Sequence, residues 1–268
     1  MTSIRLENGK RLAYDTYDFT PPWTNPEVVV LVHGFTKHRK YWYKWIPQLA
    51  QHYKVIAVDQ FGHGESDPFP DDFQMSIRPF SDDLAFLLQG LGIPSAHFVM
   101  AEFSSIIALD FAVAHPSVIR SLILPGFFYR IGKVGLDWQG WEKIAAEQGS
   151  EAWARATNNV RLPADADPVM REWYVTQQGH FPAVHLAHFC RFARTVDLSD
   201  NIPQVSMPAL LMTGEFAVHE SAAGVRAAAA LMKQGQVKIF QGMPMNVMSA
   251  CPELSIAESL IFLRELRR

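Results

Sequence analysis

The stretch HFVMAEFSSIIALDFAVAHP, residues 97–116, decides the fold. It begins with a short apolar run from His97 to Val99, a pattern typical of a buried strand. It continues into Ser105 to Ala114, where apolar residues recur at helical spacing. A strand followed directly by a helix is the repeating unit of α/β proteins. Glu102 lies at the join, so the sequence places a carboxylate in the turn between the two elements.

The same alternation extends in both directions from this stretch. Residues 1–18 alternate apolar and polar side chains around Asn8-Gly9, which predicts a hairpin. Further strands are predicted at Val28 to Val32, Val55 to Val58, Ser121 to Leu124, Ala209 to Met212 and Val237 to Phe240. Helices are predicted at Tyr41 to His52, Ser81 to Leu91, around Ala227 to Ala230, and at Pro252 to Leu266. The fold class is therefore α/β, with a mostly parallel twisted sheet flanked by helices.

One long segment interrupts the alternation. Between residues 128 and 205 several helical patterns occur without a convincing strand, and the segment contains Trp138, Trp141, Trp153 and Trp173. We interpret it as an inserted helical cap. Residues 1–127 and 206–268 then form the α/β core.

Composition narrows the range of functions. The chain has 268 residues, of which 49% are hydrophobic and 19% charged, as expected of a globular protein. A net charge of −3 gives no indication of nucleic-acid binding. No apolar run approaches the roughly 18 residues that span a bilayer, so no membrane partner is expected. The first residues lack the pattern of a signal peptide, which favours a cytoplasmic protein.

The sequence indicates neither a cofactor nor a metal ion. Cys190 and Cys251 are far apart and give no disulfide framework, so we expect two reduced, buried thiols. No histidine, cysteine or carboxylate cluster has metal-ligand spacing, and no glycine-rich phosphate loop is present. The expected partner is a small molecule. The oligomeric state stays open, a homodimer included.

Five motifs, in this order, resemble those of the α/β-hydrolase superfamily. They are LVHGF (31–35), DQFGHGESD (59–67), the opening stretch (97–116), MPALLMTGE (207–215) and FQGMPMNVMSACPEL (240–254). The resemblance covers essentially the whole chain and implies the α/β-hydrolase fold. The helical insertion looks most like that of the enol-lactonase and C–C-bond hydrolase branch.

By this resemblance, all three members of the usual catalytic triad are missing. Glu102 takes the position of the nucleophilic serine, Ala217 that of the acid and Met245 that of the histidine. A serine-type hydrolase is excluded on mechanism, because hydroxyl attack needs an adjacent base. Met100 and Ser104 stand where the family has small residues or glycine, so we expect a relaxed or wider turn.

The resemblance still implies an oxyanion hole, because its donors are the backbone N–H groups of Phe35 and Phe103. A carboxylate among apolar neighbours is poorly solvated, and such burial favours the protonated acid, suited to move a proton near neutral pH. We therefore expect Glu102 to be a general acid/base beside an oxyanion hole.

Further residues are candidates for the substrate site. The pocket is expected to include Met100, Met243, Met245, Trp138, Trp153 and Trp42. Lys37, His38 and Arg39 follow the oxyanion loop and would steer an anionic substrate, or else form a solvated loop. His219 and His185 are candidate auxiliary bases, although a lone histidine is more often a packing residue.

Three functions remain open. The first is a cofactor-independent enzyme that acts on a small, anionic or aromatic carbonyl compound such as an ester, a lactone or an enolisable keto acid. The second is an inactive, hydrolase-like protein that binds a ligand in the capped cavity, as hormone receptors of this fold do. The third is a cofactor-free dioxygenase or lyase on an enolisable substrate.

Overall fold

A computed structural model describes residues 2–131 and 136–267 and contains one eight-stranded sheet with the order β1-β2-β4-β3-β5-β6-β7-β8. The first two strands form the predicted hairpin, with Gly9 at φ 86° in its turn. Strand β2 pairs antiparallel with β4, and every later pairing is parallel. The strands are β1 (Thr2–Arg5), β2 (Arg11–Tyr17), β3 (Val28–Val32), β4 (Lys54–Val58), β5 (Ala96–Met100), β6 (Ile119–Pro125), β7 (Ala209–Gly214) and β8 (Gly235–Phe240).

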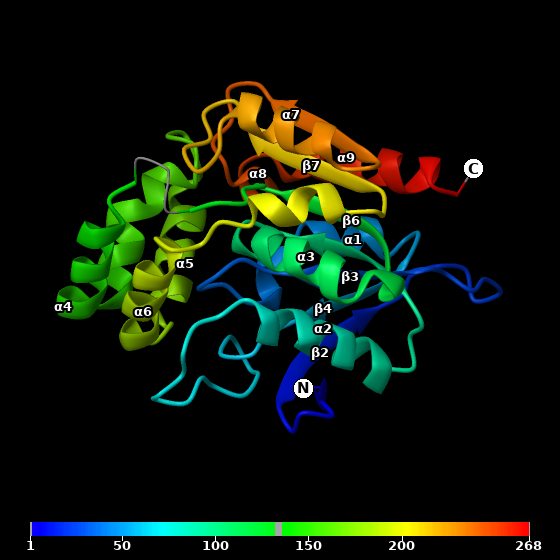
Figure 1. Cartoon of the computed structure of the whole chain (residues 1–268), viewed down its shortest axis with the longest axis horizontal. Coiled ribbons are helices and arrows are strands. Elements are labelled where there is room, and N and C mark those ends of the chain that lie inside the picture. The colour runs from blue at the N-terminus through cyan, green and yellow to red at the C-terminus, as the bar shows by residue number, and fades with distance from the viewer. Residues whose placement is uncertain (1, 132–135, 268) are drawn as a thin grey trace.

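Helices cover both faces of the sheet (Figure 1). One apolar cluster joins one face to α2 (Arg78–Gly90), α3 (Phe103–Ala114) and α7 (Ala222–Leu231). A second cluster joins the other face to α1 (Trp45–Leu49), α8 (Val247–Ala250) and α9 (Pro252–Glu265). Burial on both faces explains why the central strands are continuous apolar runs. The predicted fold class, a mostly parallel α/β sheet flanked by helices, is confirmed.

The predicted helix from Tyr41 to His52 is wrong in detail. The segment instead forms a 3-10 turn, η1 (Arg39–Trp42), followed by the short α1. Pro47 lacks a backbone N–H and is tolerated only in the first turn of a helix, which fits a helix that begins at Trp45. Within η1 the side chains of Arg39, Tyr41 and Trp42 are buried, whereas Lys40 is exposed.

Three helices lie together at one end of the molecule (Figure 1). They are α4 (Trp138–Thr157), which is kinked at Gly149, α5 (Pro168–Gly179) and α6 (Ala183–Ala193), with the short η3 (Asn158–Val160) after α4. We call α4–α6 the three-helix segment. An isolated antiparallel bridge pairs Arg130, which precedes this segment, with Asp197, which follows it.

The last part of the predicted insertion packs on the core. The turn η4 (Ser199–Gln204) lies against α3, where Asn201 Nδ2 donates to the carbonyl of Leu109 at 3.4 Å. A further short turn, η2 (Pro116–Val118), connects α3 to β6. None of the helices in the described ranges is both long and apolar enough to cross a bilayer.

Parallel pairing brings the candidate site together. Val32, the last residue of β3, is level with Met100, the last residue of β5. The loops that follow, His33-Gly34-Phe35 and Ala101-Glu102-Phe103, therefore leave the sheet side by side. Carboxyl ends of parallel strands are where α/β proteins build their sites.

Candidate active site

Glu102 occupies a strained turn between β5 and α3. Its backbone has φ 53° and ψ −118°, one of two positive φ values among described non-glycine residues. The turn is held by its own amide, which donates to Pro125 O at 2.9 Å, and by the Ala101 amide, which donates to Val32 O at 3.0 Å. The expectation of a relaxed turn is wrong, because these neighbouring strands fix the backbone despite Met100 and Ser104.

Two glycines make room for the Glu102 side chain. A Cβ atom on Gly34 would lie 2.5 Å from Glu102 Oε2, closer than real Cβ contacts allow. A Cβ atom on Gly126, whose φ is 77°, would lie 3.2 Å from Glu102 Cγ. The carboxylate is thus packed directly against the backbone of the loop after β3.

Lys37 forms an ion pair with Glu102. Its Nζ lies 2.7 Å from Glu102 Oε1, and its side chain is fully buried. Burial lowers the pKa of the Lys37 ammonium, while the charge and hydrogen bond of Glu102 act in the opposite direction. The ammonium also lies 5.5 Å and 5.6 Å from the ring centroids of Tyr41 and Tyr174. The steering role predicted for Lys37 is therefore wrong, and Glu102 is not the isolated carboxyl that we expected.

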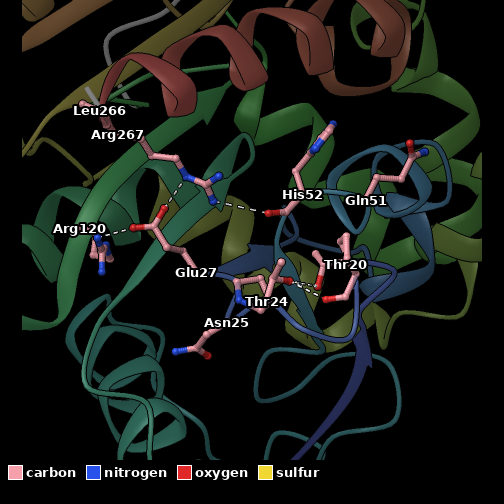
Figure 2. Close-up of a pocket in the computed structure, with 11 residues that line it drawn as sticks. Thr20, Thr24, Asn25, Glu27, Gln51, His52, Arg120, Leu266 and Arg267 are labelled. Atoms are coloured by element: carbon pink, nitrogen blue, oxygen red, sulfur yellow. Dashed lines mark hydrogen bonds and ion pairs between the residues drawn. The ribbon is translucent and has the colours of Figure 1, made fainter.

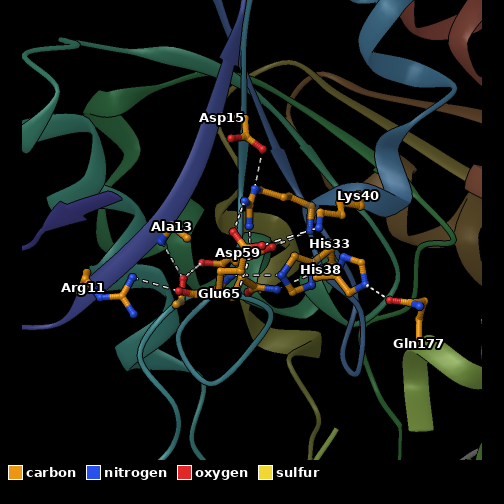
Figure 3. Close-up of polar contacts among 12 residues, drawn as sticks. Arg11, Ala13, Asp15, His33, His38, Lys40, Asp59, Glu65 and Gln177 are labelled. Carbon is orange, nitrogen blue, oxygen red and sulfur yellow. Dashed lines mark hydrogen bonds and ion pairs between the residues drawn. The ribbon is translucent and has the colours of Figure 1, made fainter. Parts of the chain in front are cut away.

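Arg39 is also committed to carboxylates. Its guanidinium forms ion pairs with Asp15, at 2.6 Å from Nε, and with Asp59 and Glu65. Figure 3 shows these three carboxylates gathered at one place beside β2. Arg39 has no free charge for a substrate, so its predicted steering role is wrong.

His38 is half-buried and lines a cavity at the surface, described below. Its Nε2 is 3.0 Å from Oε1 of Gln177 in α5 (Figure 3). This contact ties the loop after β3 to the three-helix segment. The surface cavity, of about 360 Å³, is also lined by Lys37, His63 and His180. A role of His38 in steering stays a prediction.

A small aromatic cavity opens beside Glu102. Its volume is about 50 Å³, the room that one or two water molecules take up in the liquid. It is lined by Phe35, Glu102, Phe103, Phe128, Ile131, Trp138, Trp141, Trp153, Arg161, Phe189, His219 and Met245. We call it the Glu102 cavity. Three of the residues predicted for the substrate pocket, Trp138, Trp153 and Met245, line this cavity.

Three other predicted pocket residues lie elsewhere. Met100 is fully buried in the cluster below α3. Trp42 is buried on the other face of the sheet, with its ring 5.3 Å from that of Trp45. Met243 packs against the same cluster as Trp42. An apolar residue near a motif can lie on either face of the sheet, so the sequence pattern does not place these three in the pocket.

The two histidines proposed as auxiliary bases are in different places. His219 lines the Glu102 cavity with its ring 5.0 Å from that of Phe128, and its Nδ1 has no hydrogen-bond partner among the described residues. Burial lowers the pKa of His219 to about 3, so the ring is neutral at pH 7 and is a weak base. His185 instead faces Phe69 and His188, at 5.3 Å and 6.2 Å, and does not line this cavity.

Arg161 is a site residue that the sequence analysis missed. It follows η3, is 7% exposed and lines the Glu102 cavity. Its guanidinium lies 4.2 Å from the centroid of Trp153. Its neighbours in sequence have neither a motif nor a periodicity that relates them to Glu102, so only the fold brings the two together.

Phe35 and Phe103, whose backbone N–H groups are the predicted oxyanion donors, are among the residues that line the same cavity. In the described structure, the backbone N–H of Phe35 has no acceptor. Phe103 is the first residue of α3, and the first N–H groups of a helix have no partner within the helix. Beside them, Gln60 fixes His33 by donating from its backbone N–H to His33 Nε2 at 3.1 Å and from its side chain to His33 O at 2.6 Å. Burial lowers the pKa of His33 to about 3. His33 is thus a neutral support for the loop that carries Phe35.

A larger cavity lies at the opposite edge of the sheet. It has a volume of about 560 Å³ and is bordered by Glu27, which directly precedes β3 (Figure 2). Glu27 forms ion pairs with Arg120 and, at 2.7 Å, with Arg267. Because its charges are paired and it lies at the amino ends of the strands, this cavity is a weaker candidate than the Glu102 cavity.

Comparison with known proteins agrees with the geometry. The alpha/beta hydrolase fold family matches residues 27–173. Strigolactone esterase D14 of Arabidopsis thaliana is 28% identical over 187 residues, 66% of this chain and 68% of that protein. A putative carbamate hydrolase, RutD, of Escherichia coli O157:H7 is 28% identical over 147 residues, 54% of each chain.

Among solved structures, the enol-lactonase from Burkholderia xenovorans LB400 superimposes with a TM-score of 0.87 at 20% sequence identity. The match covers 98% of this chain and 100% of that chain. In sequence and in fold, the chain is hydrolase-like.

Proposed function

Because this chain belongs to the α/β hydrolase fold family, we propose that it is a cofactor-independent enzyme that moves a proton on a small carbonyl compound. Glu102 is the general acid/base, and the amides of Phe35 and Phe103 are the oxyanion donors. The observation that carries the proposal is the buried ion pair between Glu102 and Lys37. It lies at the turn between β5 and α3, where Glu102 lines the Glu102 cavity.

The ion pair suits Glu102 to proton abstraction. Lys37 Nζ donates to Glu102 Oε1 at 2.7 Å and so fixes the position of the carboxylate. An ionised Glu102 takes the proton from the carbon next to the substrate carbonyl, and the electron pair of that C–H bond moves onto the carbonyl oxygen. The resulting enolate oxygen is stabilised by the two amides, each worth about 3 kcal/mol. Return of the proton from Glu102, to carbon or to a leaving group, completes the cycle.

The two serines that follow Glu102, Ser104 and Ser105, both donate hydrogen bonds to backbone carbonyls. Ser104 Oγ donates to the carbonyl of His33, and Ser105 Oγ donates to that of Phe128 at 2.9 Å. Met245 lines the cavity where the family resemblance expects a histidine. These contacts support a reaction that depends on the carboxylate rather than on a serine.

Replacement of Glu102 by glutamine tests the proposal. The amide has the same shape but cannot accept a proton, so turnover of enolisable acids and lactones should fall by roughly 10² to 10⁴-fold. The measurement is product formation with a panel of such compounds, beside circular dichroism to show that the fold is intact. Glu172→Gln, on the exposed surface of α5, is the control and should keep full activity. Unchanged turnover in Glu102→Gln would show that Glu102 is not the acid/base.

The small size of the Glu102 cavity favours a second function, ligand binding without turnover. A site of about 50 Å³ that contains a methionine at the histidine position fits a protein that has kept the fold and lost the chemistry. The same compounds would then raise the melting temperature without being converted. Conversion together with stabilisation identifies the enzyme.

A further inference from the structure

Arg161 is a buried cation with unused hydrogen-bonding capacity. It is 7% exposed, and its Nη1 has no hydrogen-bond partner in the described structure. Buried charged groups in proteins are normally paired, because an unpaired one is costly. The other buried cations here obey that rule, since Lys37 pairs with Glu102 and Arg39 with three carboxylates.

The guanidinium is charged at neutral pH. Burial lowers the pKa of Arg161 to about 10, with the charge of Glu102 acting in the opposite direction. The group therefore keeps its proton at pH 7. Its contact with the Trp153 ring, at 4.2 Å, orients the guanidinium plane but does not neutralise its charge.

The charges around the Glu102 cavity do not balance. Lys37 and Glu102 cancel each other, and His219 is neutral because burial lowers its pKa to about 3. Arg161 is left over, which gives the described site a net charge of one positive unit. A ligand that carries one negative charge would balance it.

We infer that Arg161 binds the carboxylate of a small monoanionic acid inside the Glu102 cavity. The ligand would also carry a carbonyl group next to the C–H bond from which Glu102 takes the proton. This second part of the inference rests on the proposed function. A guanidinium presents parallel N–H donors that match a carboxylate. The rings of Phe35, Phe103 and Phe189 offer an apolar wall for the rest of the ligand. The substrate class is therefore a short keto acid.

The size of the cavity limits the ligand in this conformation. About 50 Å³ holds only a group of a few atoms. Arg161 and Trp153 belong to the three-helix segment, whereas Glu102 belongs to the core. A longer acid therefore requires that the segment move away from the core, and the bound carboxylate would link the two.

Isothermal titration with pyruvate, acetate and phenylpyruvate tests the inference without turnover. The wild-type protein should bind at least one of these acids. The amide of the same acid, which carries no charge, should bind roughly 10- to 100-fold more weakly, the ratio expected for loss of a charged hydrogen bond. Arg161→Gln should lose the same factor, and Arg161→Lys should recover part of it. Arg155→Gln, an exposed arginine of α4, is the matched control and should bind as wild type does.

Stability separates a binding role from a structural one. Since Arg161→Gln removes an unpaired buried charge, the melting temperature of the free protein should stay the same or rise. The inference is overturned if no acid binds, if Arg161→Gln binds as wild type does, or if it melts at a lower temperature. Glu102→Gln should still bind the acid, so retained turnover in that variant would refute the proposed function and leave the carboxylate site standing.

Discussion

Replacement of Lys37 by methionine is expected to destabilise the protein by about 3 to 5 kcal/mol, the cost of breaking a buried ion pair. Methionine is unbranched and nearly as long as lysine, so it keeps most of the buried aliphatic part of the Lys37 side chain. It removes the ammonium and leaves the carboxylate of Glu102 buried without its partner. Equilibrium unfolding in urea measures the change.

Two further variants identify the cause of that loss. The double variant Lys37→Met/Glu102→Gln carries no unpaired charge and should recover most of the stability. Lys44→Met removes a lysine whose partner is Glu253 at 3.2 Å, with side chains that are 52% and 71% exposed. An exposed pair contributes at most about 1 kcal/mol. A Lys37→Met variant as stable as Lys44→Met would contradict the described ion pair.

Acid is expected to destabilise the protein steeply below pH 6. Burial lowers the pKa of His33, His63 and His219 to about 3 in the folded protein. In the unfolded chain each returns to its ordinary value near 6.5. Between these values only the unfolded chain takes up the protons, so the stability that is fully present above pH 6.5 is lost as the pH falls towards 3. Three such groups give about 4 kcal/mol per pH unit near pH 5.

Urea unfolding between pH 7 and pH 4.5 measures this slope. His219→Gln should reduce it by about 1.4 kcal/mol per pH unit, since one proton fewer is taken up on unfolding. His52 is exposed, and His52→Gln should leave the slope unchanged. A protein whose stability is constant across this range would show that the three rings are not buried in the neutral form.

The strands could be predicted from the sequence because their environment is simple. Runs such as Val28 to Val32 are short, apolar at every position and rich in β-branched residues, a pattern typical of a strand covered on both faces. The 41–52 segment is harder to predict, because Tyr41, Trp42 and Trp45 recur at helical spacing although they belong to a 3-10 turn and a separate short helix. Packing against the sheet produces the same spacing as a helix face.

The site residues that lie within a recognisable motif could be predicted from the sequence. Glu102, Phe35 and Phe103 lie within stretches that resemble known motifs, and the fold brings them to one edge of the sheet. The burial of Lys37 is not predictable from its neighbours, because a run of basic residues such as Lys37, His38 and Arg39 usually indicates a solvated loop. Its burial depends on a contact with a residue 65 positions away, and local sequence does not show that contact.

The central claim is that Glu102 takes a proton from a carbon atom, and exchange of that proton in D₂O tests it most directly. Proton NMR of pyruvate, acetoacetate and phenylpyruvate follows loss of the C–H signal next to the carbonyl. The wild-type protein should accelerate the loss for at least one acid, Glu172→Gln should do so equally, and Glu102→Gln should exchange no faster than buffer. Exchange at the buffer rate with wild-type protein, or equal acceleration by Glu102→Gln, would contradict the claim.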